Sequence, residues 1–598
     1  MTGNSHPPDD PVRRRLLRTM ALGGAAAGLG LWREPVWALT SEGQPTVLSG
    51  TQFDLSIGST PVNLTGRPAH AFTINGSLPG PILRWREGDT ITLRVRNTLP
   101  SMTAIHWHGI LLPANMDGVP GLSFHGIEPG GDYLYRFRVR QSGTYWYHSH
   151  SSLQEQAGVY GALIIDPLEP EPFAFDRDYV VMLSDWTDMD PHRLFARLKK
   201  RSDYDNYYKR TVGDFLRDAR KDGFSAALAD RKAWGAMRMS PTDLADVNGH
   251  TYTYLANGQT SQDNWTALFK PGERIRLRFI NGAAMTFFDV RIPGLKLTVV
   301  AADGQNVHPV SVDEFRIAPA ETYDVIVQPE SEQAYTVFAQ AMDRSGYVRA
   351  TLAPRMGMQA PVPALDKRAL LTMSDMGHGG HSMKGMEGGC GASMGMKGTE
   401  GACGASMGMQ GTGHDMASMS HEGGMVKHPA SESSNPNVDM QTMSPEPRLD
   451  DPGIGLRDNG RSVLRYADLR SLFADPDGRE PGREVELHLT GNMERFTWGF
   501  DGIKFSDAEP VRLKYGERAR ITLVNDTMME HPIHLHGLWS DVEDADGNFM
   551  VRKHTVSIPP GTKRSYRVTA DALGRWAFHC HMLMHMEAGM MREVRVDE

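Results

Sequence analysis

The chain has 598 residues, enough for about three to four domains of ordinary size. Hydrophobic residues make up 40% and charged residues 23%, which is the balance of a soluble globular protein. The formal net charge of −9 is spread along the chain, and no Lys/Arg block lies outside the N-terminus, so nucleic-acid binding has no electrostatic basis. The 34 methionines are unusually many, and three cysteines exclude a rich disulfide framework.

The N-terminal residues indicate export. Arg13-Arg14-Arg15 precedes a short apolar stretch, Met20 to Leu31, and Val36-Trp37-Ala38 offers a small residue to a signal peptidase. Paired arginines and weak hydrophobicity favour the twin-arginine (Tat) route, and roughly 12 apolar residues are too few for a stable membrane anchor. We predict a Tat signal peptide over residues 1–38, contact with the Tat export machinery, and a periplasmic location.

Beyond about residue 45 the chain alternates apolar and polar residues with the period of a half-buried strand. Gly, Pro and Asn turns separate these short segments, which predicts an all-β protein built from β-sandwiches. The clearest segments are residues 90–96, 133–139, 274–280, 323–327, 519–524 and 565–568.

A unit made of a turn, a strand and a final asparagine occurs three times, at residues 88–97, 271–281 and 515–525. Three copies predict three related sandwich domains. Residues 191–235 break the β pattern with charged residues and apolar residues at helical spacing, which predicts a helical insertion used for packing or as an interface. Residues 373–450 are dominated by Gly, Met, Ser and His, a composition that predicts a disordered, mobile loop.

Histidines are paired in an unusual way. Random placement of the 23 histidines would give about one pair flanking a single residue. A single pair is equally typical of two core histidines, but four together indicate metal ligands, because residues i and i+2 of a strand share a face. Two pairs come early and two late, which places the site between the first and last domains. The four elements are His106-Trp107-His108, His148-Ser149-His150, His534-Leu535-His536 and His579-Cys580-His581.

The last element holds a thiol between its histidines, and alternation turns Cys580 to the opposite face. His585 and Met590 follow at intervals of five residues, and His531 lies upstream. One thiolate, two imidazoles and a weak axial thioether are typical of a blue-copper electron-transfer site. Zinc would need no axial methionine and would leave the neighbouring histidines unexplained.

The patterns His-Trp-His-Gly, His-Ser-His, His-Pro-x-His-Leu-His-Gly and His-Cys-His-x3-His-x4-Met resemble the copper signatures of multicopper oxidases over essentially the whole mature chain. Further likeness to the CopA/PcoA-type periplasmic copper-resistance branch comes from the Tat signal, residues 114–121, 185–188 and 496–498, and the Met/His-rich insert. The resemblance implies three cupredoxin-like, Greek-key domains over residues 45–167, 168–355 and 356–598.

The resemblance also implies four copper ions and assigns their ligands. It gives the type 1 ion His531, Cys580, His585 and Met590, and the type 2 ion His106 and His534. It gives the two type 3 ions His108, His148, His150, His536, His579 and His581. Electrons would enter at the type 1 ion and pass along the Cys580 backbone to the oxygen-reducing cluster. By the same resemblance Asp117 supplies protons, although it equally suits a turn before Gly118, and Glu587 is a displaced match for a second acid.

The Met/His-rich insert holds 13 methionines between Met373 and Met443, and a duplicated unit begins at Cys390 and again at Cys403. Thioethers select Cu(I), whereas ordinary linkers favour Gly, Ser, Pro and Glu, so copper binding is favoured over a linker grown by repeat slippage. Cys390 and Cys403 bind Cu(I), form a disulfide or merely accompany the duplication; the sequence leaves all three open. The predicted auxiliary Cu(I) ligands are Met373, Met376, His378, His381, Met383, Met386, Met394, Met396, Met407, Met409, His414, Met416, Met419 and His421.

Taken together, the residues predict an oxidase that couples one-electron oxidation of Cu(I) to four-electron reduction of O2 to water, in copper resistance alongside other copper-resistance proteins. Two alternatives stay open. One is a laccase-like enzyme whose reductant is a small phenol, and the other is a periplasmic protein that sequesters copper without turnover.

Overall fold

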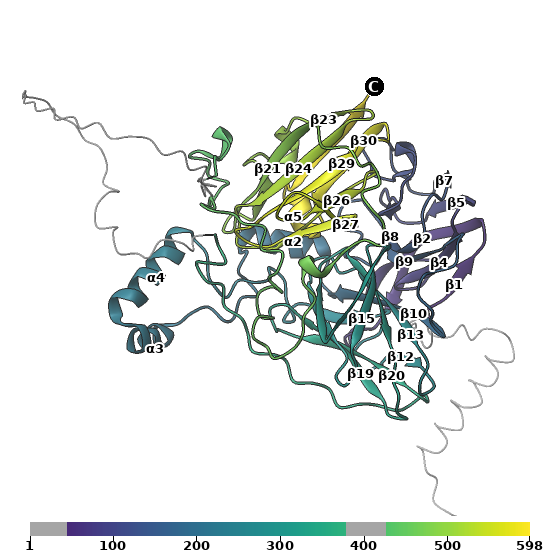
Figure 1. Cartoon of the computed structure of the whole chain (residues 1–598), viewed down its shortest axis with the longest axis horizontal. Helices are drawn as coiled ribbons and strands as arrows, with labels where there is room; N and C mark the ends of the chain where they lie inside the picture. Colours follow the sequence, from purple (N-terminus) through teal and green to yellow (C-terminus); the bar gives the residue numbers. More distant parts are fainter. Residues whose placement is uncertain (1–44, 378–425) are drawn as a thin grey trace, which may run out of the picture.

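The computed structural model describes residues 45–377 and 426–598 and shows three β-sandwiches joined in chain order (Figure 1). The first is drawn in purple and blue, the second in teal, and the third in green and yellow. The predicted signal peptide at residues 1–38 lies outside the described residues. In the part of the chain that the structure describes, no helix is both long enough and apolar enough to cross a membrane.

The first sandwich packs a sheet of order β1-β4-β9-β8-β6 against one of order β3-β2-β5-β7. A short 3-10 helix, η2 (Ala114–Met116), leads into Asp117. The strands are β1 (Val47–Ser49), β2 (Gln52–Val62), β3 (Ala69–Ile74), β4 (Gly80–Arg86), β5 (Thr90–Asn97), β6 (His106–His108), β7 (Asp132–Arg138), β8 (Gly143–His148) and β9 (Tyr160–Asp166).

The second sandwich has sheets of order β11-β10-β13-β18-β15-β16 and β12-β20-β19-β14-β17. Most of its strands are buried on both faces: β8 of the first sandwich contacts β13 and β18, and Val463 and Ser471, ahead of the third sandwich, form bridges to Glu314 and Val307. The strands are β10 (Arg177–Trp186), β11 (Thr253–Ala256), β12 (Thr266–Leu268), β13 (Ile275–Asn281), β14 (Phe288–Arg291), β15 (Leu297–Ala302), β16 (Gln305–Val312), β17 (Glu314–Ile317), β18 (Thr322–Val327), β19 (Tyr335–Ala341) and β20 (Tyr347–Ala353).

The third sandwich has sheets of order β22-β21-β24-β29-β26-β27 and β23-β31-β30-β25-β28. It also holds η3 (Ala430–Glu432), η4 (Tyr466–Asp468), η5 (Phe505–Asp507) and the short helix α5 (Leu583–Glu587). The strands are β21 (Arg483–Asn492), β22 (Thr497–Phe500), β23 (Val511–Lys514), β24 (Arg518–Asn525), β25 (His531–Leu535), β26 (Ser540–Glu543), β27 (Phe549–Lys553), β28 (Thr555–Ile558), β29 (Lys563–Thr569), β30 (Gly574–Cys580) and β31 (Met591–Asp597).

The sequence prediction of fold class is confirmed. All six segments expected to alternate are strands, namely β5, β7, β13, β18, β24 and β29. The helical insertion is also confirmed, as α2 (Pro191–Lys200), α3 (Val212–Asp222) and α4 (Phe224–Ala236). Helix α2 buries Leu194 and Leu198 and packs on the third domain, where Lys199 donates a hydrogen bond of 2.8 Å to the carbonyl of Phe496. The insertion therefore serves as an interdomain contact.

The three repeated asparagines have one structural role. Asn97, Asn281 and Asn525 each end a central strand and are fully buried. Each amide donates to two backbone carbonyls at 2.8–3.0 Å, and each side-chain oxygen accepts from the backbone two residues later. These bonds give hydrogen-bond partners to the backbone carbonyl and amide groups of the turn that follows each strand. Without the asparagine, those groups would be buried without partners.

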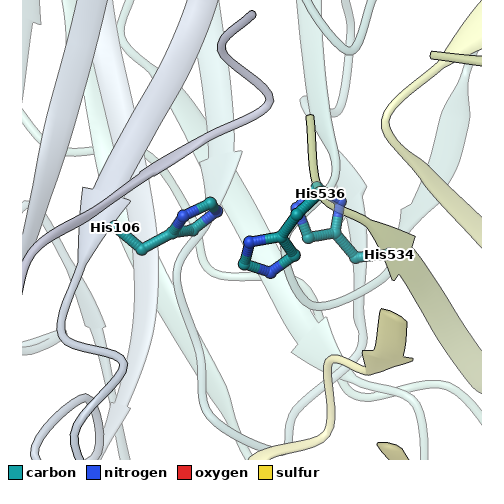
Figure 2. Close-up of side chains that lie close together, drawn as sticks. All are labelled: His106, His534 and His536. Carbon is teal, nitrogen blue, oxygen red and sulfur yellow. The ribbon is translucent and has the colours of Figure 1, made fainter. Parts of the chain in front are cut away.

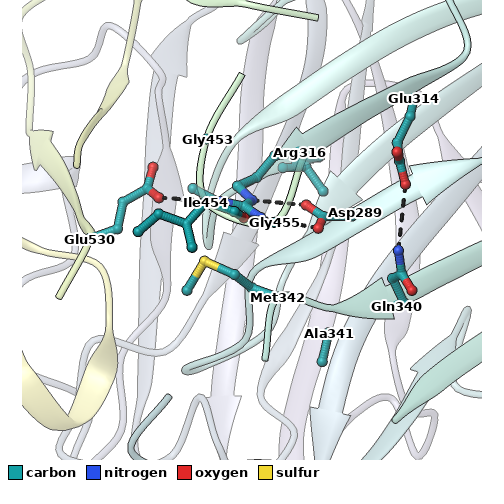
Figure 3. A network of polar contacts seen from close by, with 12 residues as sticks. Asp289, Glu314, Arg316, Gln340, Ala341, Met342, Gly453, Ile454, Gly455 and Glu530 are labelled. Atoms are coloured by element: carbon teal, nitrogen blue, oxygen red, sulfur yellow. Dashed lines mark hydrogen bonds and ion pairs between the residues drawn. The ribbon is translucent and has the colours of Figure 1, made fainter. Parts of the chain in front are cut away.

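A buried ion-pair network joins the second and third domains (Figure 3). The Arg316 guanidinium binds the Asp289 carboxylate at 2.8 and 3.0 Å, donates to the carbonyl of Ile454 at 2.8 Å and lies 3.8 Å from Glu530. Burial acts against ionisation, but Arg316 and Arg344 hold the pKa of Asp289 below its usual value. Glu530 directly precedes His531, so the network fixes a predicted ligand strand against the second domain.

The borders of the low-complexity stretch are packed. Residues 378–425 lie outside the described residues, but Met376, Glu432, Met440 and Thr442 are all buried. Gly377 has a φ of 71°, and a Cβ there would lie 2.0 Å from Thr442 Oγ1, so the two borders meet closely. The composition-based prediction of a mobile loop over residues 373–450 is thus corrected for residues 373–377 and 426–450, which pack against the third domain.

Asn281→Ala tests the repeated asparagine. The change leaves two carbonyls and one amide without partners in a buried turn, and we expect it to cost about 3 kcal/mol of folding free energy. For a domain of this size that corresponds to a fall of roughly 6–10 °C in the unfolding midpoint, measured by calorimetry. Asn306→Ala, at an exposed side chain of β16, is the control. Equal midpoints for the two variants would contradict the role assigned to Asn281.

Candidate metal centres

Strand pairing brings the four His-x-His elements to one place. In the first domain β6 pairs with β8 so that His106 faces His148, and in the third domain β25 pairs with β30 so that His534 faces His579. Figure 2 shows His106 of the first domain pointing at His534 and His536 of the third. The ring centroids of His106 and His536 are 3.9 Å apart. The cluster therefore lies between the first and third domains.

The imidazole nitrogens within this cluster lie so close together that their lone pairs would repel each other unless a proton or a cation lay between them. The Nε2 atom of His579 is 3.0 Å from that of His536 and 3.2 Å from that of His150. Several groups of three histidines each place their possible ligand atoms within 4.8 Å of one another. One such group is His106, His534 and His536, and the groups share members. All eight side chains are buried or nearly so.

Backbone carbonyls turn several of these rings inward. The Nδ1 atoms of His106, His534 and His579 donate to the carbonyls of Asp117, His554 and Cys580 at 2.8, 2.6 and 3.0 Å. An outward Nδ1–H leaves the Nε2 lone pair facing the cluster, the arrangement expected of a metal ligand. Buried ring nitrogens without a hydrogen-bond partner are His106 Nε2, His108 Nδ1, His148 Nε2, His534 Nε2 and both nitrogens of His581.

Two buried carboxylates contact the cluster. Asp117 Oδ2 lies 2.8 Å from His536 Nδ1, and Asp117 Oδ1 lies 3.3 Å from His106 Nδ1 with no hydrogen-bond partner. Glu155 Oε2 lies 2.7 Å from His148 Nδ1, and burial raises the pKa of Glu155 well above its usual value. Asp117 thus touches histidines of both domains, whereas Glu155 orients a single ring.

The electrostatics keep the imidazoles neutral. Burial, and then repulsion from neighbouring rings, lowers the pKa of His108, His150, His534, His536 and His581 well below its usual value. The same causes lower the pKa of His148, and burial lowers that of His579 to about 3. Neutral imidazoles with inward lone pairs are a donor set for transition-metal cations.

A second ligand set lies on the other face of β30. Cys580 Sγ is 3.5 Å from His531 Nδ1, which is 3.3 Å from His585 Nδ1, and all three residues are fully buried. Met590 is also buried, and its carbonyl accepts a hydrogen bond of 3.1 Å from the Cys580 amide. Burial raises the pKa of the Cys580 thiol, so a thiolate here needs a bound cation to compensate its charge.

Neighbours outside this set fix its two rings. His531 Nε2 lies 2.7 Å from Thr527 Oγ1, and His585 Nε2 lies 2.7 Å from the Asp246 carboxylate. Trp498 stacks on the His585 ring with centroids 3.9 Å apart. Both histidines therefore direct Nδ1 toward the cysteine sulfur, and the indole shields one of them from water.

Comparison with known proteins decides the family. Family profiles described as multicopper oxidase match residues 56–170, 177–355 and 478–598. The chain belongs to the multicopper oxidase family. As a multicopper oxidase it is an oxidoreductase that uses O2 as electron acceptor.

Relatives agree over nearly the full length. The chain is 66% identical to copper resistance protein A of Escherichia coli over 98% of this chain and 99% of the relative. It is 65% identical to the copper resistance protein A homologue of Pseudomonas syringae pv. tomato, over 99% and 100%. The solved structure of Fet3p, described as a multicopper oxidase that functions in iron import, superposes with a TM-score of 0.62 at 18% identity, covering 92% of this chain and 91% of that one. At 18% identity this likeness shows a shared fold and no more.

Eleven of the twelve residues predicted as ligands of the oxidase lie in the two ligand sets. The twelfth, Met590, lies directly beside the set that contains Cys580. Contacting residues that were not predicted include Glu155, Asp246, Thr527 and His554. Glu155 lies five residues after His150, which was a usable signal, but Asp246 is too far away in sequence to signal its contact. His554 Nδ1 lies 3.2 Å from His108 Nε2, although His554 belongs to no pair.

Two groups of predicted site residues stand apart from the clusters. Glu587 is exposed at the end of α5, which gives its expected role near the ligands no structural support. Met376 is fully buried in the hydrophobic core, and Met373 packs against that core. The auxiliary Cu(I) ligands predicted between His378 and His421 lie outside the described residues, as do Cys390 and Cys403.

Asp117→Ala and Glu155→Ala test the carboxylates. Removal of either leaves a ligand ring free to rotate, and we expect copper affinity to fall by about 10- to 100-fold. Copper content is measured after equilibration with a graded series of chelator concentrations. Glu587→Ala, at an exposed carboxylate, is the control and should match the unchanged protein. Equal copper retention in all four proteins would refute the positioning roles.

Proposed function

We propose that this oxidase oxidises Cu(I) to Cu(II) and reduces O2 to water in periplasmic copper resistance. Per turnover, four Cu(I) ions and four protons react with one O2, which gives four Cu(II) ions and two waters. The full-length similarity to proteins named for copper resistance supports the biological role. The predicted Tat signal at residues 1–38 supports export to the periplasm.

The proposal depends above all on one observation: the two ligand sets are joined through the consecutive residues His579, Cys580 and His581. The Cys580 side chain belongs to one set, and its two sequence neighbours lie in the other, His579 beside His536 and His581 with its ring centroid 5.0 Å from that of His148. Electrons accepted at the sulfur therefore have a covalent route of one residue to the eight-histidine cluster. A protein that only stored copper would have no need of such a connection.

We assign the ligands as the family resemblance implies. His531, Cys580, His585 and Met590 hold the type 1 ion, His106 and His534 the type 2 ion, and the type 3 pair is held by His108, His148, His150, His536, His579 and His581. The inward, unpartnered nitrogens of the cluster fit these roles. We call His531, Cys580, His585 and Met590 the thiolate set. When bound, copper supplies single-electron transfer at the thiolate set and multi-electron reduction of O2 at the eight-histidine cluster.

The protein's own groups orient ligands and carry protons. The Asp117 carboxylate has one oxygen bound to His536 and a second, unpartnered oxygen that can hold a proton beside the cluster. Asp246 and Thr527 keep His585 and His531 directed at the cysteine. The buried indole of Trp498 excludes water from the His585 face.

The Met/His-rich stretch favours Cu(I) over a phenol as the electron donor. Its thioethers are uncharged and soft, so they collect cuprous ions without competition from protons. Its borders at Gly377 and residue 426 lie on the third domain, which also carries the thiolate set. A laccase-like phenol oxidase is the alternative enzyme, and a copper-sequestering protein is the alternative outside catalysis.

Cys580→Ser separates catalysis from storage. A serine hydroxyl is a hard, weakly acidic ligand, so we expect loss of the blue absorption, loss of one copper and a fall of O2 uptake to background. The measurements are copper content, visible spectrum and O2 consumption with Cu(I). The same variant is tested for copper tolerance in cells. Tolerance that survives without O2 uptake would favour sequestration.

Deletion of residues 378–425 separates the two candidate reductants and leaves the packed border residues in place. If the stretch concentrates Cu(I) near the enzyme, kcat/KM for Cu(I) should fall by about 10- to 100-fold while phenol oxidation is unchanged. A replacement of the same stretch by Gly and Ser at equal length is the control for chain length. If the deletion left Cu(I) oxidation unaltered and changed phenol turnover, the assignment of Cu(I) as substrate would be wrong.

A further inference from the structure

Another group of possible metal ligands lies in the third domain, apart from the copper ligand sets. The His488 Nδ1 atom is 2.7 Å from the Asp526 carboxylate, and His428 Nδ1 is 3.1 Å from the same oxygen. The Glu432 carboxylate lies 3.1 Å from His428 Nδ1 and 3.7 Å from His488 Nδ1. Each of the two imidazole Nδ1 atoms thus lies within 4 Å of both carboxylates.

The spacing of these four groups fits a small cation. For nitrogen and oxygen ligands at about 2.0–2.1 Å, the corners of a tetrahedron lie roughly 3.3–3.4 Å apart. The four nitrogen–oxygen separations of 2.7, 3.1, 3.1 and 3.7 Å, two of which run to different oxygens of Glu432, lie on either side of that value. The donor set of two imidazoles and two carboxylates is one that borderline divalent ions accept.

Each ring is held as a ligand ring is held. His428 donates from Nε2 to the carbonyl of Thr442 at 2.9 Å, and His488 Nε2 lies 3.4 Å from the Glu486 carboxylate. Both outer contacts hold the rings with Nδ1 directed at the two carboxylates, where a cation would replace the Nδ1 proton. The carboxylates are positioned too, since the Thr442 amide donates to Asp526 at 2.6 Å and Gln441 donates to Glu432 at 2.9 Å.

One coordination position is unused. Glu432 Oε1 is buried, faces His488 and has no hydrogen-bond partner, and Glu432 as a whole is 3% exposed. Two buried carboxylates carry a charge of −2, which a divalent cation with two neutral imidazoles would balance.

The fold itself assembles the group. His488 lies on β21 and Asp526 directly follows β24, and the parallel pairing of these strands places them side by side. Glu432 ends η3, which also brings in His428. The side chain of His428 is 16% exposed, so an ion can reach the centre from solvent past that ring.

We propose that His428, Glu432, His488 and Asp526 form a further metal site that binds a divalent copper ion. Cu(I) is disfavoured because the set contains no sulfur, and Mg²⁺ and Ca²⁺ are disfavoured because two of the ligands are imidazoles. Among divalent first-row ions, copper binds nitrogen and oxygen sites most tightly, ahead of zinc. The site does not depend on which reductant the oxidase uses.

The site lies close to the type 1 ligand set. Asp526 precedes Thr527, whose hydroxyl lies 2.7 Å from Nε2 of the type 1 ligand His531. Thr442, which positions both His428 and Asp526, also adjoins Gly377 at the start of the Met/His-rich stretch. A divalent copper ion would therefore be bound between that stretch and the residues that accept electrons from the reductant.

Metal titration of the full-length, copper-loaded oxidase tests the site. Cu(II) and, separately, Zn(II) are added, and bound metal is counted after equilibrium dialysis for the unchanged protein, Glu432→Gln and His428→Gln. We expect each variant to lose one equivalent of tight binding, with the dissociation constant of that equivalent raised about 100-fold or more. Ions held elsewhere in the chain count equally in all proteins and cancel in the difference.

The controls are Glu494→Gln and His308→Gln, which remove an exposed carboxylate and an exposed imidazole of the same kinds. Retention of the type 1, type 2 and type 3 coppers and an unchanged unfolding midpoint in chelator show that a variant is folded. If both site variants bind as many ions as the controls, the group is an ion-pair network and the proposal is wrong. Tighter binding of Zn(II) than of Cu(II) would overturn the preference for copper.

Discussion

The structure depends on eight buried imidazoles that are directed at one another across a domain interface. Their nitrogens approach to 3.0 Å, which is repulsive unless cations lie between them. Burial disfavours the alternative of protonation, since the pKa values of His534 and His536 fall well below the usual value. The contact between the first and third domains is therefore stable as a metal-binding contact, and backbone carbonyls at His106 and His534 define it before any ion binds.

The repeated asparagine turn shows how one structural device acquires a chemical role. In the first two domains Asn97 and Asn281 only satisfy the backbone at the end of a strand. In the third domain Asn525 also accepts a hydrogen bond of 2.8 Å from Thr527, whose hydroxyl contacts His531. The turn that closes the sandwich thus also sets the orientation of a ligand ring, which ties ligand geometry to fold stability.

The sequence predicted what depends on local spacing and missed what depends on distant contacts. Strand alternation and His-x-His spacing are properties of a few neighbouring residues, so the six strands and the ligand positions could be predicted. The contact of Asp246 with His585 joins segments more than 300 residues apart and left no local pattern. Composition likewise could not reveal that residues 426–450 pack against the third domain, because burial there depends on partners such as Asp526. Glu587, placed by analogy with a displaced position, is exposed.

The second domain supplies no predicted copper ligand, yet it holds the ligands of the third. The Ala284 carbonyl accepts a hydrogen bond of 2.9 Å from the Leu583 amide at the start of α5, the helix that carries His585. Asp246 binds the His585 ring, and Arg316 lies beside Glu530, the residue before His531. Both imidazoles of the thiolate set are thereby fixed from outside their own sandwich. Because the geometry of such a site governs its electron transfer, the second domain acts on the reaction through position alone.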